Sequence, residues 1–139
     1  MDHSSSRRLL DILIENSARI LRAGFGVNRA ESTFFDVVDL LKENSSLKSY
    51  FLELVDYTFA KKDSGALDAG MVPRELIELV AHEVRWKEFL DLAESRIRKV
   101  FHGDGSLAVG DVAHGVIDAY KNDWRDREFY KRYGGDVSG

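Results

Sequence analysis

The chain has 139 residues, of which 44% are hydrophobic and 32% charged, and its net charge is −4. That length suits one domain, which would bury roughly 70% of its unfolded surface, and the composition is too apolar for a disordered chain. Because there is no cysteine, disulfides, thiolate metal sites and cysteine nucleophiles are excluded. The lack of a long apolar run argues against a membrane-spanning helix, and the acidic charge argues against a general nucleic-acid coat.

The two ends of the chain give an expected location and an expected tail. Asp11 and Glu15 interrupt the first apolar stretch, which is unlike a secretory signal, so we expect a cytoplasmic protein. Residues 134–139 are small and polar, and we expect a flexible tail there, following a single helical domain over residues 1–133.

Apolar residues recur every three or four positions in the first half of the chain, which predicts helices. The first helix is expected to start with Ser6 as its N-cap and to stop at Gly24. The second would start at Asn28, with Glu31 three residues later as in a capping box. Since only residues 44–46 separate the second helix from a third, we predict that these two form an antiparallel hairpin.

The second half of the chain continues the helical pattern. Residues 61–72 are the longest unpatterned stretch and predict a loop, after which Pro73 suits a first helical turn. Two out-of-phase apolar stripes then predict a break at residues 85–87. The turn expected at residues 102–106 would precede another helix and a final short one through Tyr133. The predicted fold is therefore all-α, a compact bundle of five or six short-to-medium helices.

Two rows of acids and histidines at helical spacing are the candidates for chemistry. Asp111, His114 and Asp118 would give a base oriented by carboxylates, but Asp111 also fits a helix cap. Glu78 and His82 would give a metal ligand pair or a shared proton. For both rows we favour a solvated polar face over a catalytic or metal site, and we predict no cofactor.

Acidic residues concentrate in residues 30–60, which contain six carboxylates and two lysines. Most of these acids would lie away from the apolar stripes, beside two aromatic residues. Interfaces commonly combine aromatic anchors with surrounding charge that selects the partner. The candidate partner-binding residues are Phe35, Asp36, Asp39, Glu43, Glu53, Asp56 and Tyr57. The alternative is a solvated face of two helices, with Phe35 buried against a third.

The stretch 120–133 interleaves five aromatic residues with five cations, and it also holds three acids. Aromatic residues and cations together are able to stack on nucleic-acid bases. Because the acids dilute the positive charge, we predict instead that this stretch packs on the bundle.

These patterns favour a protein that binds another protein, most naturally a basic one. One concrete form is an inhibitor of the immunity or antitoxin type, which would cover the site of a toxic nuclease. The alternatives are a small helical enzyme or metal-binding protein that uses one of the two rows, and a structural or oligomerisation module that could form a homodimer.

Overall fold

The computed structural model describes residues 2–61, 71–108, 110–121 and 123–133. These residues form six α-helices and four short 3-10 helices, with no strand among them, which confirms the predicted all-α bundle. The tail predicted at residues 134–139, and most of the loop predicted at residues 61–72, lie outside the described residues. The α-helices are α1 (His3–Arg22), α2 (Val27–Glu43), α3 (Lys48–Phe59), α4 (Arg74–Val84), α5 (Glu88–Phe101) and α6 (Val112–Ala119). The 3-10 helices are η1 (Ser45–Leu47), η2 (Gly105–Ala108), η3 (Arg125–Phe129) and η4 (Lys131–Tyr133).

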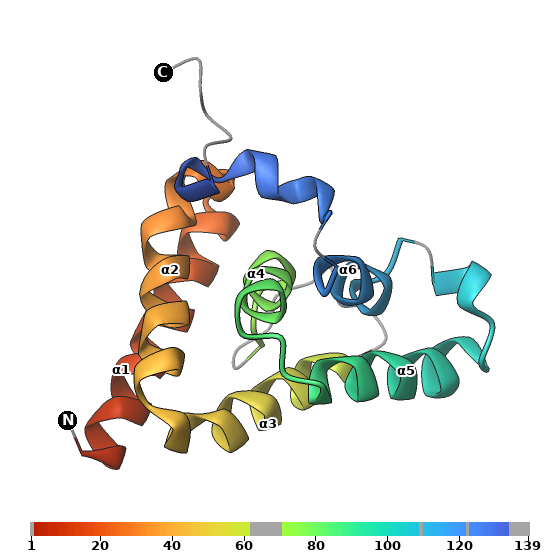
Figure 1. Cartoon of the computed structure of the whole chain (residues 1–139), viewed down its shortest axis with the longest axis horizontal. Helices are drawn as coiled ribbons and strands as arrows, with labels where there is room; N and C mark the ends of the chain where they lie inside the picture. Colours follow the sequence, from red (N-terminus) through yellow and green to blue (C-terminus); the bar gives the residue numbers. More distant parts are fainter. Residues whose placement is uncertain (1, 62–70, 109, 122, 134–139) are drawn as a thin grey trace.

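The bundle is arranged around α4 (Figure 1). In the view of Figure 1, α1 and α2 form one side, α3 and α5 lie across the bottom, and η3 and η4 cross the top, while α6 lies beside α4. Seven consecutive residues of α4, residues 76–82, are buried. Because the middle of α4 is covered on all sides, its polar residues Glu78 and His82 lie in the interior of the protein.

The start of α1 differs from the prediction. The helix begins at His3 because the Asp2 side chain caps it and accepts a hydrogen bond from the Ser5 backbone N–H (2.8 Å). Ser6, the predicted N-cap, is buried inside the helix, where its hydroxyl donates to the Asp2 carbonyl oxygen. The predicted stop at Gly24 is confirmed, since its φ of +92° is a conformation that favours glycine.

The start of α2 also differs from the prediction, because its N-cap is Gly26 and no side chain caps it. The expected capping box of Asn28 and Glu31 is therefore wrong. The Glu31 carboxylate instead accepts hydrogen bonds from the backbone of η4. Glu31 therefore makes a tertiary contact with η4 in place of the local capping contact that its spacing from Asn28 predicted.

The second and third helices do not form the predicted antiparallel hairpin. The helix that packs along α2 is α1, which the turn at residues 23–26 reverses, and α3 runs away from α2 across the bottom of the bundle (Figure 1). Between the two helices lies η1, whose fully buried Leu47 packs into the core and so anchors the connection before α3. The final predicted helix is also replaced, by the two 3-10 helices η3 and η4.

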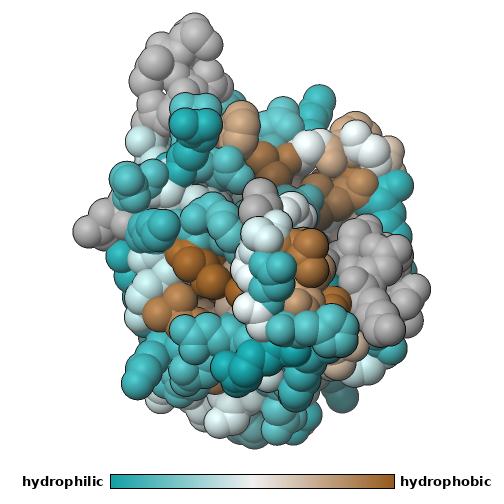
Figure 2. Space-filling view, turned by 90° about the vertical axis from the view of Figure 1, so that its right-hand side faces the viewer, coloured by the Kyte–Doolittle hydropathy of each residue, from teal (hydrophilic) through white to brown (hydrophobic). Residues whose placement is uncertain are grey.

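The predicted break at residues 85–87 is confirmed. Arg85 ends α4 in the left-handed conformation, with φ of 53°, and α5 begins at Glu88. The surface turned to the viewer in Figure 2 is mainly hydrophilic, and apolar residues reach it in several separate places. None of the helices described has the length and apolar character needed to cross a bilayer.

Candidate functional site

Residues 124–133 cross the top of the bundle in the view of Figure 1, where they contact α2 and α4, and we call this segment the C-terminal clasp. Aromatic side chains fix the clasp to the bundle. Trp124 and Tyr130 are buried, and the Phe35 ring of α2 makes edge-on contacts with Tyr130 and Tyr133 at centroid distances of 5.9 and 5.8 Å. The aromatic and basic stretch therefore packs on the bundle, as predicted.

Acidic residues of α2 hold the backbone and one cation of the clasp. The Glu31 carboxylate accepts hydrogen bonds from the N–H groups of Lys131 (2.9 Å) and Arg132 (3.2 Å). The Arg132 guanidinium lies 3.6 Å from the Asp39 carboxylate and 4.2 Å from the centre of the Phe35 ring. Phe35 and Asp39, two of the candidate partner-binding residues, thus already bind this chain's own C-terminal segment.

His82 of α4 joins the clasp to α6 through both ring nitrogens. Its Nε2 lies 2.9 Å from Nη1 of Arg127, and since a guanidinium only donates, Nε2 accepts this hydrogen bond. The ring proton is therefore on Nδ1, which donates to the Ala119 carbonyl oxygen (2.7 Å) at the end of α6. Trp124 covers the ring at a centroid distance of 4.9 Å. His82 is thus a neutral, fully hydrogen-bonded group inside the protein.

Glu78 lies one turn before His82 and is also buried. Its carboxylate accepts a hydrogen bond from Arg74 Nε (2.8 Å), and it packs against the backbone of α6 at Gly115. Burial raises the pKa of Glu78, and the hydrogen bond from Arg74 opposes that shift only in part. The solvated face predicted for Glu78 and His82 is therefore wrong, because α6 and the clasp cover the face of α4 that carries them.

The residues of the second predicted row, Asp111, His114 and Asp118, have two different roles in the structure. Asp111 is the N-cap of α6, and its two carboxylate oxygens accept hydrogen bonds from Arg96 Nε (2.6 Å) and Nη2 (2.8 Å). Burial opposes ionisation, but the hydrogen bonds from Arg96 and the α6 backbone hold the pKa of Asp111 below its usual range. His114 instead faces Asp118 at 3.3 Å on the surface, where both side chains are more than 40% exposed.

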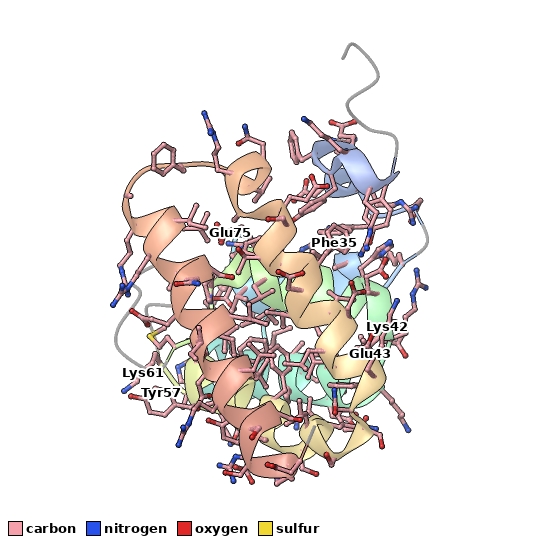
Figure 3. The ribbon with its side chains drawn as sticks, turned by 90° about the vertical axis from the view of Figure 1, so that its left-hand side faces the viewer. Phe35, Lys42, Glu43, Tyr57, Lys61 and Glu75 are labelled. Carbon is pink, nitrogen blue, oxygen red and sulfur yellow. The ribbon has the colours of Figure 1, made fainter. Side chains whose placement is uncertain are left out.

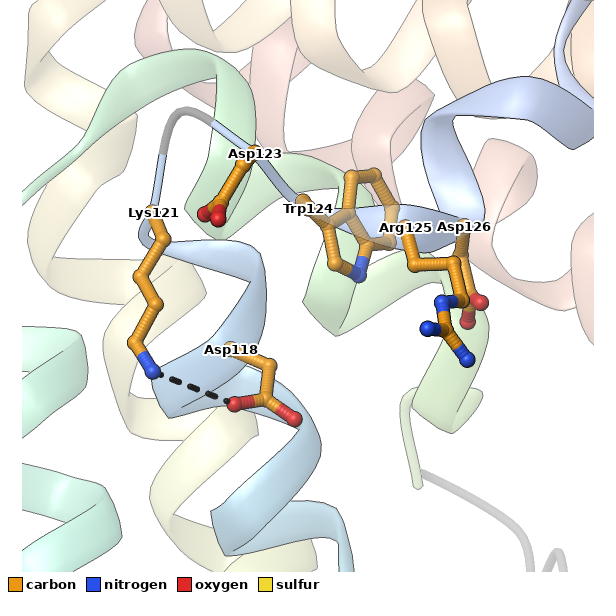
Figure 4. A pocket seen from close by; sticks show the side chains of 6 residues that line it. All are labelled: Asp118, Lys121, Asp123, Trp124, Arg125 and Asp126. Atoms are coloured by element: carbon orange, nitrogen blue, oxygen red, sulfur yellow. Dashed lines mark ion pairs between the residues drawn. The ribbon is translucent and has the colours of Figure 1, made fainter.

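Asp118 also forms one wall of an open hollow of about 350 Å³ (Figure 4). Lys121 is 3.6 Å from the Asp118 carboxylate, and the other lining residues are Asp123, Trp124, Arg125 and Asp126. Acids and cations alternate along this hollow, so their charges largely compensate one another. The hollow does not bring Asp111, His114 and Asp118 to a common point.

Arg96 is a buried structural residue that the sequence analysis did not single out. Its side chain is fully buried, and besides binding Asp111 it donates hydrogen bonds to the carbonyl oxygens of Phe59 (2.6 Å) and Lys61 (2.5 Å) at the end of α3. A signal for it was present, because Arg96 continues the apolar stripe of Phe89 and Ala93 at helical spacing. A cation in such a stripe indicates a buried charge that needs partners.

The remaining candidate partner-binding residues lie on the surface. Asp36, Glu43, Glu53 and Asp56 are exposed, and none of them forms an ion pair with a described residue. Tyr57 is 45% exposed, with the Lys61 ammonium 4.7 Å from its ring centre. Glu43 and Tyr57 lie on opposite sides of the view in Figure 3, so the acids do not surround both aromatic residues in one patch.

The two lysines in the same stretch of sequence do not neutralise these acids. Lys42 is 2.7 Å from Glu83 of α4, and Lys48 is 3.1 Å from Glu88 of α5. Both lysines are thus paired with glutamates from outside residues 30–60. The surface of α2 and α3 keeps the negative charge of its four exposed carboxylates.

The polar groups of the two predicted rows do not converge on a common point. His82, Glu78 and Asp111 direct their polar atoms to groups of the fold itself, and His114 is exposed. Within the described ranges, no three histidine, aspartate or glutamate side chains are placed to hold a metal ion. No protein-family model, curated protein or solved structure matches the chain.

Proposed function

We propose that this protein is a non-catalytic binding module that recognises a basic protein partner through the carboxylates of Asp36, Glu43, Glu53 and Asp56. The observation that supports the proposal is the charge imbalance on α2 and α3. Four exposed carboxylates there have no ion pair with a described residue, whereas both lysines of the same stretch are paired elsewhere.

Unpaired surface carboxylates act on a partner before contact is made. Their field attracts a cationic surface over distances of about 10 Å at ordinary ionic strength, which accelerates association and disfavours acidic partners. A nuclease is one class of partner with such a surface, because its substrate groove must attract phosphate. An inhibitor of the immunity or antitoxin type, covering that groove, is the specific form of this proposal.

The proposal is tested by reversing charge on α2 and α3. The tagged protein is co-expressed with the product of the neighbouring gene, and the association rate of the purified pair is measured at low and high salt. We expect a salt-sensitive complex, and we expect Glu43→Lys/Glu53→Lys to slow its association by about tenfold or more at low salt. The dissociation rate should change much less.

The matched control is Glu94→Lys/Glu128→Lys. These two glutamates are also exposed and have no ion pair with a described residue, but they lie on α5 and η3. The net charge changes equally in both variants, so only the position of the charge differs. Equal slowing in the two variants, or no complex with the wild-type protein, would refute the proposal.

A further inference from the structure

We infer that the C-terminal clasp is a pH-sensitive latch, which loosens when the buried His82 ring takes up a second proton. The inference rests on the two hydrogen bonds of the ring. Nδ1 already carries the ring proton and donates it to the Ala119 carbonyl oxygen, so Nε2 is the only atom that is able to accept another proton. That atom holds the clasp by accepting from Arg127.

A second proton would place two cations in direct contact. Arg127 Nη1 lies 2.9 Å from Nε2, and a protonated Nε2 no longer accepts a hydrogen bond. The imidazolium and the guanidinium would then repel each other in a partly buried site, where water screens charge poorly. Arg127 must therefore move away, and η3 moves with it.

The other groups around the ring do not remove this repulsion. On α4 itself, Glu78 is bound by Arg74, and the Glu83 carboxylate already accepts from Lys42 of α2 and from the Tyr133 hydroxyl of η4. Arg85 adds a further cation on α4 and donates to the His82 carbonyl oxygen.

From α6 the ring meets the Ala119 carbonyl, and the nearby Asp118 is paired with His114 and Lys121. On η3, Asp126 lines the open hollow beside Asp118 and directly precedes Arg127, so it moves with Arg127. No carboxylate among the described residues accepts a hydrogen bond from the His82 ring.

The sign of the pH dependence follows from burial. Burial, assisted by Arg127 and Arg85, lowers the pKa of His82 below its ordinary 6.5, although the hydrogen bond to Ala119 and the charge of Glu83 oppose the shift. In the loosened state the ring is solvated and binds its proton more readily. The closed clasp is thus fully stable above pH 6.5 and loses stability as the pH falls below that value. Loosening would uncover Glu31, Phe35 and Asp39 on α2.

The experiment follows Trp124, which covers the His82 ring. Trp86 is the second of the two tryptophans, and Trp86→Phe makes Trp124 the only one while preserving an aromatic ring against Phe89. Acrylamide quenching of Trp124 is measured from neutral to mildly acidic pH. We expect quenching to rise about twofold or more, with a midpoint below 6.5, while far-UV circular dichroism keeps its helical signal.

Two variants and one control test the assignment to His82. His82→Gln should show no transition, and Arg127→Met should show strong quenching at every pH, because it removes the clasp contact without burying a new charge. His114→Gln removes an exposed histidine and should leave the transition unchanged.

The latch is refuted by an unchanged transition in His82→Gln or Arg127→Met, or by loss of the helical signal at the same midpoint as the Trp124 change. Arg127→Met keeps the test valid if His82→Gln does not fold, since Arg127 is only partly buried. The assay contains no partner, so its result does not depend on the proposed function.

Discussion

Single residues decide where this protein tolerates polar groups in its interior. Glu78 and His82 project from a helix whose other buried residues are apolar. Glu78 is stable there because Arg74 of the same helix donates to it, and His82 because α6 and η3 supply its hydrogen bonds. Gly115 of α6 has no side chain, and this leaves space for the Glu78 carboxylate. A methyl group at Gly115 would contact Glu78 Oε2, and it would lie 2.9 Å from Glu78 Cδ and 3.1 Å from Arg74 Nη2.

Gly115→Ala should therefore destabilise the protein although alanine is the better helix former. Alanine gains about 1 kcal/mol in helix propensity, but displacing the buried carboxylate from Arg74 costs roughly 2 kcal/mol. We expect a net loss of about 1 kcal/mol in the free energy of unfolding, measured by urea denaturation.

The control removes the carboxylate that the methyl group meets. In a Glu78→Ala background, Gly115→Ala should become stabilising, since only the gain in helix propensity remains. An equal effect of Gly115→Ala in both backgrounds would show that the close approach to Glu78 has no energetic consequence.

Helix ends are set by local chemistry in some elements and by tertiary contacts in others. α4 and α5 both end in a left-handed residue that is not glycine, at Arg85 and His102. At the end of α5, the N–H groups of His102 and Gly103 both donate to the Ile97 carbonyl oxygen, Gly103 at 3.0 Å, while His102 has a left-handed φ of 54°. His102 therefore occupies the position at which glycine has no steric cost.

His102→Gly should stabilise the protein by roughly 1 kcal/mol, because it removes the left-handed penalty at an exposed residue. The same substitution three residues earlier, Lys99→Gly, should destabilise it by about 1 kcal/mol, because Lys99 lies inside α5. Thermal denaturation of the two variants measures the difference. Destabilisation by both would mean that the His102 side chain contributes contacts beyond its backbone conformation.

On the scale of the whole molecule, one buried arginine ties three helices together. Arg96 of α5 binds the Phe59 carbonyl at the end of α3, the Lys61 carbonyl just beyond it and the capping aspartate of α6, so its guanidinium joins segments that are distant in the sequence. Such a residue is costly to remove, because its partners stay buried with unmet hydrogen bonds.

Arg96→Met should lower the free energy of unfolding by about 3–5 kcal/mol, since it preserves side-chain volume but removes the hydrogen bonds that Arg96 donates to the Asp111 carboxylate and to two carbonyl oxygens. Arg98→Met, an exposed site on the same helix, should change it by less than about 0.5 kcal/mol. Urea denaturation compares the two. A small effect at Arg96 would mean that water replaces the guanidinium.

The sequence alone determined where the six α-helices lie, because helical periodicity, Gly24, Pro73 and the capping Asp111 act within a few residues of chain. Only the tertiary structure decided which faces meet. The face with Glu78 and His82 looked solvated, yet α6 and the clasp cover it, and the acids of α2 divide between those that hold the clasp and those that remain exposed. Spacing along a chain reports which side chains share a helix face, but burial of that face depends on segments that arrive from elsewhere in the sequence.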